Sequence, residues 1–235
     1  MIEGLTEQLK NQFNITFADE KLLLEAFTQG NYLNEHPEEL SNGARDYQRL
    51  EFLGDAVMQL AVADYLFKSN QDWSEGQLTE MRISMVQTKS FAHFARLAKF
   101  DEFIRLGKGE ENANARNRDS LLEDVFEAFI GALYLDQDMD AVQNFLKQTV
   151  FSGENDFFNQ LVDYKTKLQE TLQRAGSVKI EYNKISETKN ADHNFNFTVE
   201  ILVNGEKFGE GTGNSIKNAE KNAAKVALKE MGEIR

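Results

Sequence analysis

The sequence predicts a multidomain protein, with an all-α domain over residues 1–151, a linker over residues 152–162 and a small α-β-β-β-α domain over residues 163–232. Apolar residues recur at helical spacing up to about Phe151, and strict apolar–polar alternation begins only after it. Charge is divided unevenly as well. Residues 164–235 carry 12 basic and 10 acidic side chains, whereas residues 1–163 carry 14 basic and 29 acidic side chains. Such asymmetry indicates two modules with different roles.

Helical spacing defines the first domain, because its apolar residues recur at steps of three and four. Ser74 and Gln77 form the pattern of a capping box, which predicts the start of a further helix. Two polar segments without periodicity, residues 30–46 and 107–119, are predicted as loops. The clearest helices are predicted from Leu5 through Leu9 to Phe13, from about Asp46 to Lys68, and from about Ser120 to Leu135.

The second domain is predicted from a change of period. A helix from Tyr164 ends at Gly176, a residue suited to a left-handed helix cap. Alternating apolar residues from Phe195 to Val203 predict a half-buried strand, and Asn204-Gly205 is a strong two-residue hairpin signal. Flanking strands are predicted over residues 178–186 and 207–211, and a closing helix over residues 215–231.

Composition excludes several classes of protein. The chain contains no cysteine, which excludes disulfides and thiolate metal sites and suits a reducing cytoplasm. No apolar run approaches the roughly 18 residues of a membrane span, and the first residues do not resemble a secretory signal. Three dispersed histidines offer no histidine-based metal site. We therefore expect a cytoplasmic protein without a membrane partner.

Two acidic pairs lie in segments that are otherwise strongly apolar. Residues 50–58 are apolar almost all round, which predicts a buried helix, and Glu51 and Asp55 share one face of it. Asp124 and Glu127 lie three residues apart in the second apolar helix. Like charges that share a buried helix face are costly unless a cation neutralises them.

Small residues accompany the second pair, since its face also carries Ser120, Ala128 and Gly131, which would let another helix approach closely. Carboxylates with small neighbours on two buried helices indicate a cage for a hard divalent cation such as Mg²⁺. One alternative is that these acids occupy the wetter edges of their helices. A di-iron carboxylate bundle is a second alternative, but it requires Glu-x-x-His pairs, which the chain lacks.

At this point the residues resemble a known family. The segment Tyr47-Gln48-Arg49-Leu50-Glu51-Phe52-Leu53-Gly54-Asp55-Ala56-Val57 is similar to the signature helix of the ribonuclease III family. Residues 121–132 resemble the second acidic motif of that family, and residues 74–79 with Arg82 and residues 106–110 match it as well. With the second domain, the resemblance covers nearly the whole chain in the bacterial domain order.

The resemblance implies roles for individual residues. Glu51, Asp124 and Glu127 would be ligands of Mg²⁺, for which Mn²⁺ could substitute, and Asp55 with Glu127 would be the catalytic pair. Phe52 would plug a pocket of a second subunit and so form a homodimer, although an isolated Phe at this spacing is more often an ordinary core residue. Gln48 stands where the family usually has Glu, at the edge of the metal cage, and we expect it to tune activity without abolishing it.

The second domain resembles a double-stranded-RNA-binding domain. The resemblance lies in residues 163–170, 193–199 and 209–224, taken in that order. It implies that the first helix and the loop around His193 reach 2′-hydroxyls in successive minor grooves, while the closing helix meets phosphates between them. The implied RNA-binding residues are Gln169, Glu170, His193, Lys217 and Lys221. Ile216 departs from the pattern, since this position is commonly basic.

Together these resemblances imply an Mg²⁺-dependent endoribonuclease that hydrolyses both strands of double-stranded RNA and leaves 5′-phosphates and short 3′ overhangs. Its expected substrates are ribosomal RNA precursors and some messenger and transfer RNAs. A non-cleaving double-stranded-RNA-binding protein on the same fold is the main alternative, which Gln48 favours slightly and the intact acids oppose. A metal-storing helical bundle is disfavoured by the scarcity of histidine and by the basic second domain.

Overall fold

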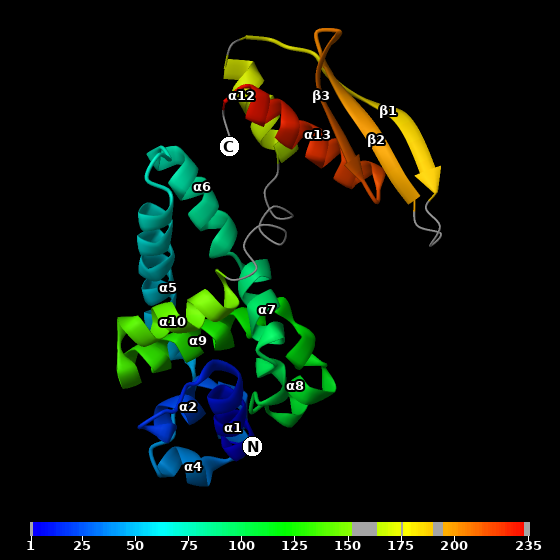
Figure 1. Ribbon diagram of the computed structural model, residues 1–235. Coiled ribbons are helices and arrows are strands. Elements are labelled where there is room, and N and C mark those ends of the chain that lie inside the picture. Colours follow the sequence, from blue (N-terminus) through cyan, green and yellow to red (C-terminus); the bar gives the residue numbers. More distant parts are fainter. Residues whose placement is uncertain (1, 152–163, 175, 190–194, 233–235) are drawn as a thin grey trace. The chain divides into compact units, whose positions relative to one another are not determined.

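The computed structural model describes residues 2–151, 164–174, 176–189 and 195–232. The chain divides into two compact units, Met1–Phe158 and Asn159–Arg235, and each is described here by itself. The first unit is helical and the second combines helices with a sheet, which confirms the predicted fold class (Figure 1). The predicted linker, residues 152–162, lies outside the described residues. Within the described parts of the chain, no helix is long and apolar enough to cross a membrane.

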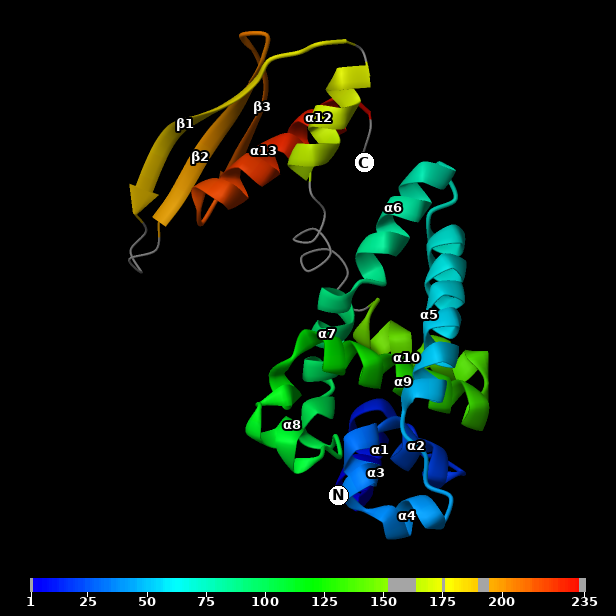
Figure 2. The same cartoon turned by 180° about the vertical axis from the view of Figure 1, so that it is seen from behind.

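The first unit consists of helices that surround one central helix. The α-helices are α1 (Ile2–Phe13), α2 (Glu20–Ala26), α3 (Gly30–Glu35), α4 (Pro37–Ser41), α5 (Gln48–Ser69), α6 (Glu75–Met85), α7 (Thr88–Leu97), α8 (Lys108–Asn112), α9 (Asp119–Gln137) and α10 (Met139–Thr149). Short 3-10 turns lie at Phe100–Glu102 and Ala115–Asn117. The capping box predicted at Ser74 and Gln77 is present at the start of α6. The end of α5 and the start of α6 project away from the other helices (Figures 1 and 2).

Helix α9 is the centre of this unit, and every residue from Val125 to Leu133 is buried. Its phenylalanines contact aromatic rings from several other parts of the unit. The ring centroid of Phe129 lies 4.8 Å from that of Phe100 and 5.0 Å from that of Phe145. Phe27 completes the cluster, at 5.1 Å from Phe100. This aromatic cluster confirms the prediction that the second apolar helix is buried.

Helices α5 and α9 touch through two glycines. A methyl group at Gly54 would overlap the carbonyl oxygen of Glu127, and one at Gly131 would overlap the carbonyl oxygen of Leu50. Only glycine allows two helix backbones to approach so closely, because any Cβ would occupy the space of the facing peptide. The predicted close approach is therefore confirmed at Gly131. Ser120, which was expected to contribute, is exposed at the start of α9.

The two segments predicted as loops contain short helices, so that prediction was wrong in detail. Residues 30–46 form α3 and α4, and α4 begins at Pro37, whose fixed φ suits the first turn of a helix. Residues 107–119 include α8. These short helices have no apolar periodicity that could predict them, and tertiary contacts stabilise them instead. Buried Arg105 forms an ion pair with Glu39 of α4, and its guanidinium carbon lies 4.1 Å from the ring centroid of Tyr32 in α3.

The second unit is a three-stranded antiparallel sheet covered by two helices. Its elements are α12 (Tyr164–Arg174), β1 (Ile180–Lys189), β2 (Phe195–Val203), β3 (Glu206–Gly213) and α13 (Ile216–Glu230), and the strand order is β1-β2-β3. Asn204 and Gly205 both have positive φ, of 52° and 89°, which confirms the predicted hairpin turn. The outer strands extend beyond their predicted ends, because pairing with β2 continues on both sides.

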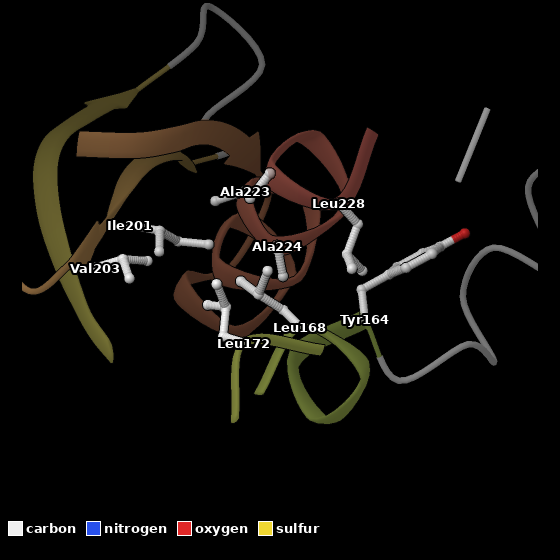
Figure 3. Close-up of a cluster of buried hydrophobic side chains, with 9 residues drawn as sticks. Tyr164, Leu168, Leu172, Ile201, Val203, Ala223, Ala224 and Leu228 are labelled. Carbon is white, nitrogen blue, oxygen red and sulfur yellow. The ribbon is translucent and has the colours of Figure 1, made fainter. Parts of the chain in front are cut away.

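The core of this unit lies between the sheet and the helices (Figure 3). Leu168 and Leu172 of α12 meet Ile201 and Val203 of β2 and the alanine-rich face of α13. Glycines at alternate positions of β3 face α13. At Gly211, for example, a Cβ would overlap the backbone of residues 222 and 223. The alanines of α13 and these glycines together let the helix lie almost directly on the strand.

Candidate active site and nucleic-acid interface

The glycine contact brings the two acidic pairs together. Asp55 follows Gly54 in α5, and Gly54 packs against the backbone of Glu127 in α9. Glu51 follows Leu50, whose carbonyl oxygen faces Gly131 one turn further along α9. The predicted acids therefore meet at one helix crossing, although Asp55 of the first pair and Asp124 of the second are 69 positions apart in sequence.

Glu127 is the most buried acid of the group, with 8% of its surface exposed. Burial raises the pKa of Glu127 to about 8, and repulsion from Asp55, Glu123, Glu51 and Asp124 adds to the rise. A carboxylate in this position is costly to ionise unless a cation lies beside it. The site therefore holds a buried carboxyl group whose ionisation a bound cation would favour.

Burial also raises the pKa of Glu51 and of Asp124, and Asp124 adds to the rise at Glu51. The phenol of Tyr47 donates a hydrogen bond to Oδ2 of Asp124 at 3.1 Å, which opposes the rise at Asp124. Asp55 is exposed, and its Oδ1 accepts a hydrogen bond from Nε2 of Gln59 at 3.4 Å. Asp55 is thus the member of the group that faces solvent and can reach a large substrate.

Two neighbours of the site were not predicted from sequence. Glu123 is a fifth acid, and it raises the pKa of both Glu51 and Glu127. Tyr47 is the hydrogen-bond donor to Asp124. Glu123 lies inside the second acidic motif, so the density of acids in that motif was a signal for it. No pattern in the sequence indicates the contact of Tyr47, because its partner is 77 residues away.

The donor chemistry of this cluster fits a hard divalent cation, since its members offer only carboxylate oxygens. Within the described residues, however, no three His, Asp or Glu side chains are already arranged so that they could hold a metal ion. The backbone brings the acids together, and rotation of some of their side chains would let them share an ion with Asp124. Rotation about the staggered χ angles of Glu and Asp provides that adjustment without movement of the helices.

Phe52 lies on a face of α5 that is exposed in the single chain. The exposed fraction of Phe52 is 82%, and Ala56, Leu60 and Phe67 continue the exposed apolar stripe along the helix. The prediction that residues 50–58 form a wholly buried helix was therefore wrong for this face. Helix α5 is apolar on two sides, of which one packs on α9 and the other has no cover within the described chain.

In the second unit, several predicted RNA-binding residues lie at the surface. Gln169 of α12 and Lys217 of α13 line the same open pocket of about 590 Å³, together with Lys165 and Tyr182. Glu170 is exposed but does not line this pocket. Lys221 follows Lys217 by one turn. His193 lies outside the described residues.

The lysines near this pocket differ in their contacts, since one pairs with an acid and two lie near an aromatic ring. Lys165 forms an ion pair with Glu220 at 2.6 Å, so its charge is partly neutralised within the domain. Lys221 and Lys225 lie with their Nζ atoms 5.8 and 5.5 Å from the ring centroid of Tyr164. These contacts place Lys221 and Lys225 beside α12, as a continuation of the row that begins at Lys217.

The outward face of the sheet has a different character. Glu200 and Glu210 are directly paired across β2 and β3, and Lys207 bridges them at 3.8 and 2.6 Å. Glu181 of β1 is paired with Lys179 at 3.0 Å. Lysines on this face are thus matched by acids. Along α13, Lys217, Lys221, Lys225 and Lys229 follow one another at steps of four, and Glu220 pairs with Lys165 of α12. A polyanion would therefore meet the helical face of this unit more favourably.

The raised pKa of Glu127 predicts how the stability of the metal-free protein depends on pH. Between the ordinary glutamate value of 4.5 and about 8, the folded chain holds a proton that the unfolded chain has lost. The free energy of unfolding must therefore fall as pH rises through this window. Glu127→Gln removes this titration. In EDTA, we expect the difference in Tm between Glu127→Gln and wild type to shift in favour of the variant as pH is raised from 4.5 to about 8.

The matched control is Glu102→Gln, which removes one exposed acid from the same unit. Its Tm should stay parallel to that of wild type across the window. Parallel curves for Glu127→Gln as well would show that Glu127 ionises normally in the folded chain.

Comparisons with known proteins agree with these features. Residues 19–153 match the family model described as ribonuclease-III-like, and residues 164–231 match the double-stranded RNA binding motif. The chain is 59% identical to ribonuclease 3 of Oenococcus oeni over 98% of its own length and 99% of that protein. It is also 59% identical to ribonuclease 3 of Leuconostoc mesenteroides, over 97% of this chain and 95% of that protein.

Solved structures show the same relationship for the first unit. The nuclease domain of ribonuclease III from Campylobacter jejuni superposes with a TM-score of 0.56 at 31% identity, covering 64% of this chain and 96% of that one. A second structure of that domain, described for flexibility in a region involved in its dimer formation, gives a TM-score of 0.54 at 34% identity and covers 60% and 94%. The chain therefore belongs to the ribonuclease III family and is an endoribonuclease.

Proposed function

We propose that this chain hydrolyses both strands of double-stranded RNA in an Mg²⁺-dependent reaction, for which Mn²⁺ could substitute, and leaves 5′-phosphates and short 3′ overhangs. The observation that carries the proposal is the crossing of α5 and α9, which gathers the other three predicted acids around buried Glu127. The double-stranded-RNA-binding domain supports the substrate class. Ribosomal RNA precursors and some messenger and transfer RNAs, processed in the cytoplasm, are the substrates that the family membership favours.

Individual residues have distinct parts in this proposal. Glu51, Asp124 and Glu127 would hold the cation, and Asp55, which is exposed beside Glu127, would face the scissile phosphate. A bound divalent cation supplies a water of lowered pKa and stabilises charge on the leaving oxygen. The surrounding helices keep Glu127 away from solvent, which strengthens its attraction to a cation. Without a cation, the same acids would repel an anionic duplex.

The test of cleavage uses the full chain, long duplex RNA and either Mg²⁺ or EDTA. We expect cutting only with Mg²⁺, and we expect Glu127→Gln to reduce it by orders of magnitude, because the amide keeps the volume but removes the charge. Duplex binding, measured by gel shift in Ca²⁺, should survive in this variant, since most RNA contacts lie on the other unit. Glu102→Gln serves as the control that loses an exposed acid.

Two results would contradict the proposal. Uncut duplex in Mg²⁺ with normal binding would favour the non-cleaving RNA-binding protein. Loss of binding in a folded Glu127→Gln variant would show that the acidic cluster itself holds the duplex.

We further propose that RNA binding depends on the lysine row of α13. Lys217 is exposed near Gln169, and Lys221 continues the row beside α12. Lys217→Ala combined with Lys221→Ala should weaken binding and flatten the log–log salt dependence by up to about two units, if each lysine neutralises one phosphate. Low salt or high protein concentration should partly restore cleavage, because the acidic site is intact.

The control for this experiment removes the same charge from the opposite face. Lys179→Ala combined with Lys207→Ala affects two lysines that are paired with acids on the outward face of the sheet. Their loss should leave the salt slope close to that of wild type. Equal slopes for wild type and the Lys217/Lys221 variant would assign the phosphate contacts to other residues.

We also propose that two copies of the chain form a homodimer through the apolar stripe of α5. Phe52 is its most exposed member, and exposed aromatic residues of this kind commonly anchor symmetric interfaces. Phe52→Ala should weaken the dimer by about 2 kcal/mol, which corresponds to roughly a 30-fold higher dissociation constant. Sedimentation velocity over a dilution series measures this change.

Leu40→Ala is the control, because Leu40 is a half-exposed apolar residue of α4, outside the stripe. It should not change the dissociation constant. A wild-type chain that is monomeric at micromolar concentration would disprove the dimer.

A further inference from the structure

Tyr47 makes three hydrogen bonds, two of which join it to the acidic pairs, at Glu51 and at Asp124. Its backbone N–H donates to the carbonyl oxygen of Thr28 at 2.9 Å, and its own carbonyl oxygen accepts from the N–H of Glu51 at 2.9 Å. Its phenol donates to Oδ2 of Asp124 at 3.1 Å. The side chain is buried, with 7% of its surface exposed. One residue thus joins the first turn of α5, which carries Glu51, to the carboxylate of Asp124 on α9.

This arrangement restricts the carboxylate of Asp124. The phenol O–H is bound to Oδ2 and so limits the rotation of the carboxylate. The phenol also favours the charged form of Asp124, which burial disfavours, because it donates a hydrogen bond to the carboxylate. Hydrogen bonds of this kind orient metal-binding side chains and raise the affinity of the site. A carboxylate without such a donor would be free to turn away from its negatively charged neighbours.

We propose that Tyr47 is a positioning residue, whose phenol holds Asp124 in the orientation in which it binds the divalent cation. This inference rests on the proposed function, in which Asp124 is a metal ligand. A purely structural role for Tyr47 is the competing explanation. The contact between α5 and α9 is already set by Gly54 and Gly131, and the buried ring would fill its space without the hydroxyl. The hydroxyl is therefore the atom that distinguishes the two roles.

The experiment removes this hydroxyl and measures binding of the metal alone. Mn²⁺ is titrated calorimetrically into full-length wild type, Tyr47→Phe, Asp124→Asn and the double variant, without RNA. Tyr134→Phe is the control, because it removes an exposed phenol from the same helix that carries Asp124. We expect Tyr47→Phe to weaken Mn²⁺ binding by about tenfold and Tyr134→Phe to leave it unchanged. In the Asp124→Asn background, Tyr47→Phe should cause no further loss.

Cleavage gives a second readout. Tyr47→Phe should need about tenfold more Mg²⁺ for half-maximal cutting, with a rate at saturating Mg²⁺ close to that of wild type. If Tyr47 had only a structural role, Tyr47→Phe would lower the Tm of the metal-free protein. Metal affinity would then stay unchanged at temperatures where the variant is folded. If Tyr47→Phe leaves Mn²⁺ affinity unchanged while Asp124→Asn weakens it, the inference about Tyr47 is wrong and the assignment of Asp124 as a ligand stands. Unchanged affinity in Asp124→Asn would overturn the ligand assignment in the proposed function.

Discussion

The contact between the backbones of α5 and α9 at Gly54 and Gly131 is the constraint on which the nuclease unit depends. Without it, Glu51 and Asp55 would belong to one helix surface and Asp124 and Glu127 to another. With it, burial and mutual repulsion act on the same few carboxylates, and the pKa of Glu127 rises to about 8. The aromatic cluster around Phe129 secures α9 from its other side, so the helix cannot move away to relieve this repulsion. Core packing thus sustains an electrostatically unfavourable site, a common property of active sites.

The two units differ in net charge, and the difference matches their separate roles. The first carries a large excess of acids, which suits a site for a hard cation but opposes an RNA duplex. The second has a small positive excess. Four of its lysines follow one another along α13, while acids match lysines on the outward sheet face. Contacts to phosphates and 2′-hydroxyls read the shape of A-form RNA, so a rigid platform of two helices on a sheet is sufficient for recognition.

The exposed apolar stripe gives helix α5 a second role beside its acids. One face of this helix carries the acids toward α9, and another presents Phe52 and its neighbours to a second copy in the proposed dimer. Metal site and interface would then share a single helix. A shift of that helix would change both together, which would couple assembly to the geometry of the acids.

The sequence by itself determined the class of both domains, the longer helices and the three strands, and it singled out the acids of both motifs. These features follow from local periodicity, from the Asn204-Gly205 turn and from motifs whose residues are adjacent in the chain. Helices α3, α4 and α8 were missed because contacts such as that between Arg105 and Glu39 hold them, and such contacts leave no periodic pattern. Only the tertiary structure decided that Gly54 meets Glu127, that Glu123 joins the cluster and that Tyr47 donates to Asp124. The physical reason is that these contacts join residues of different helices, and their energies depend on burial and approach distance, which arise only when the helices pack.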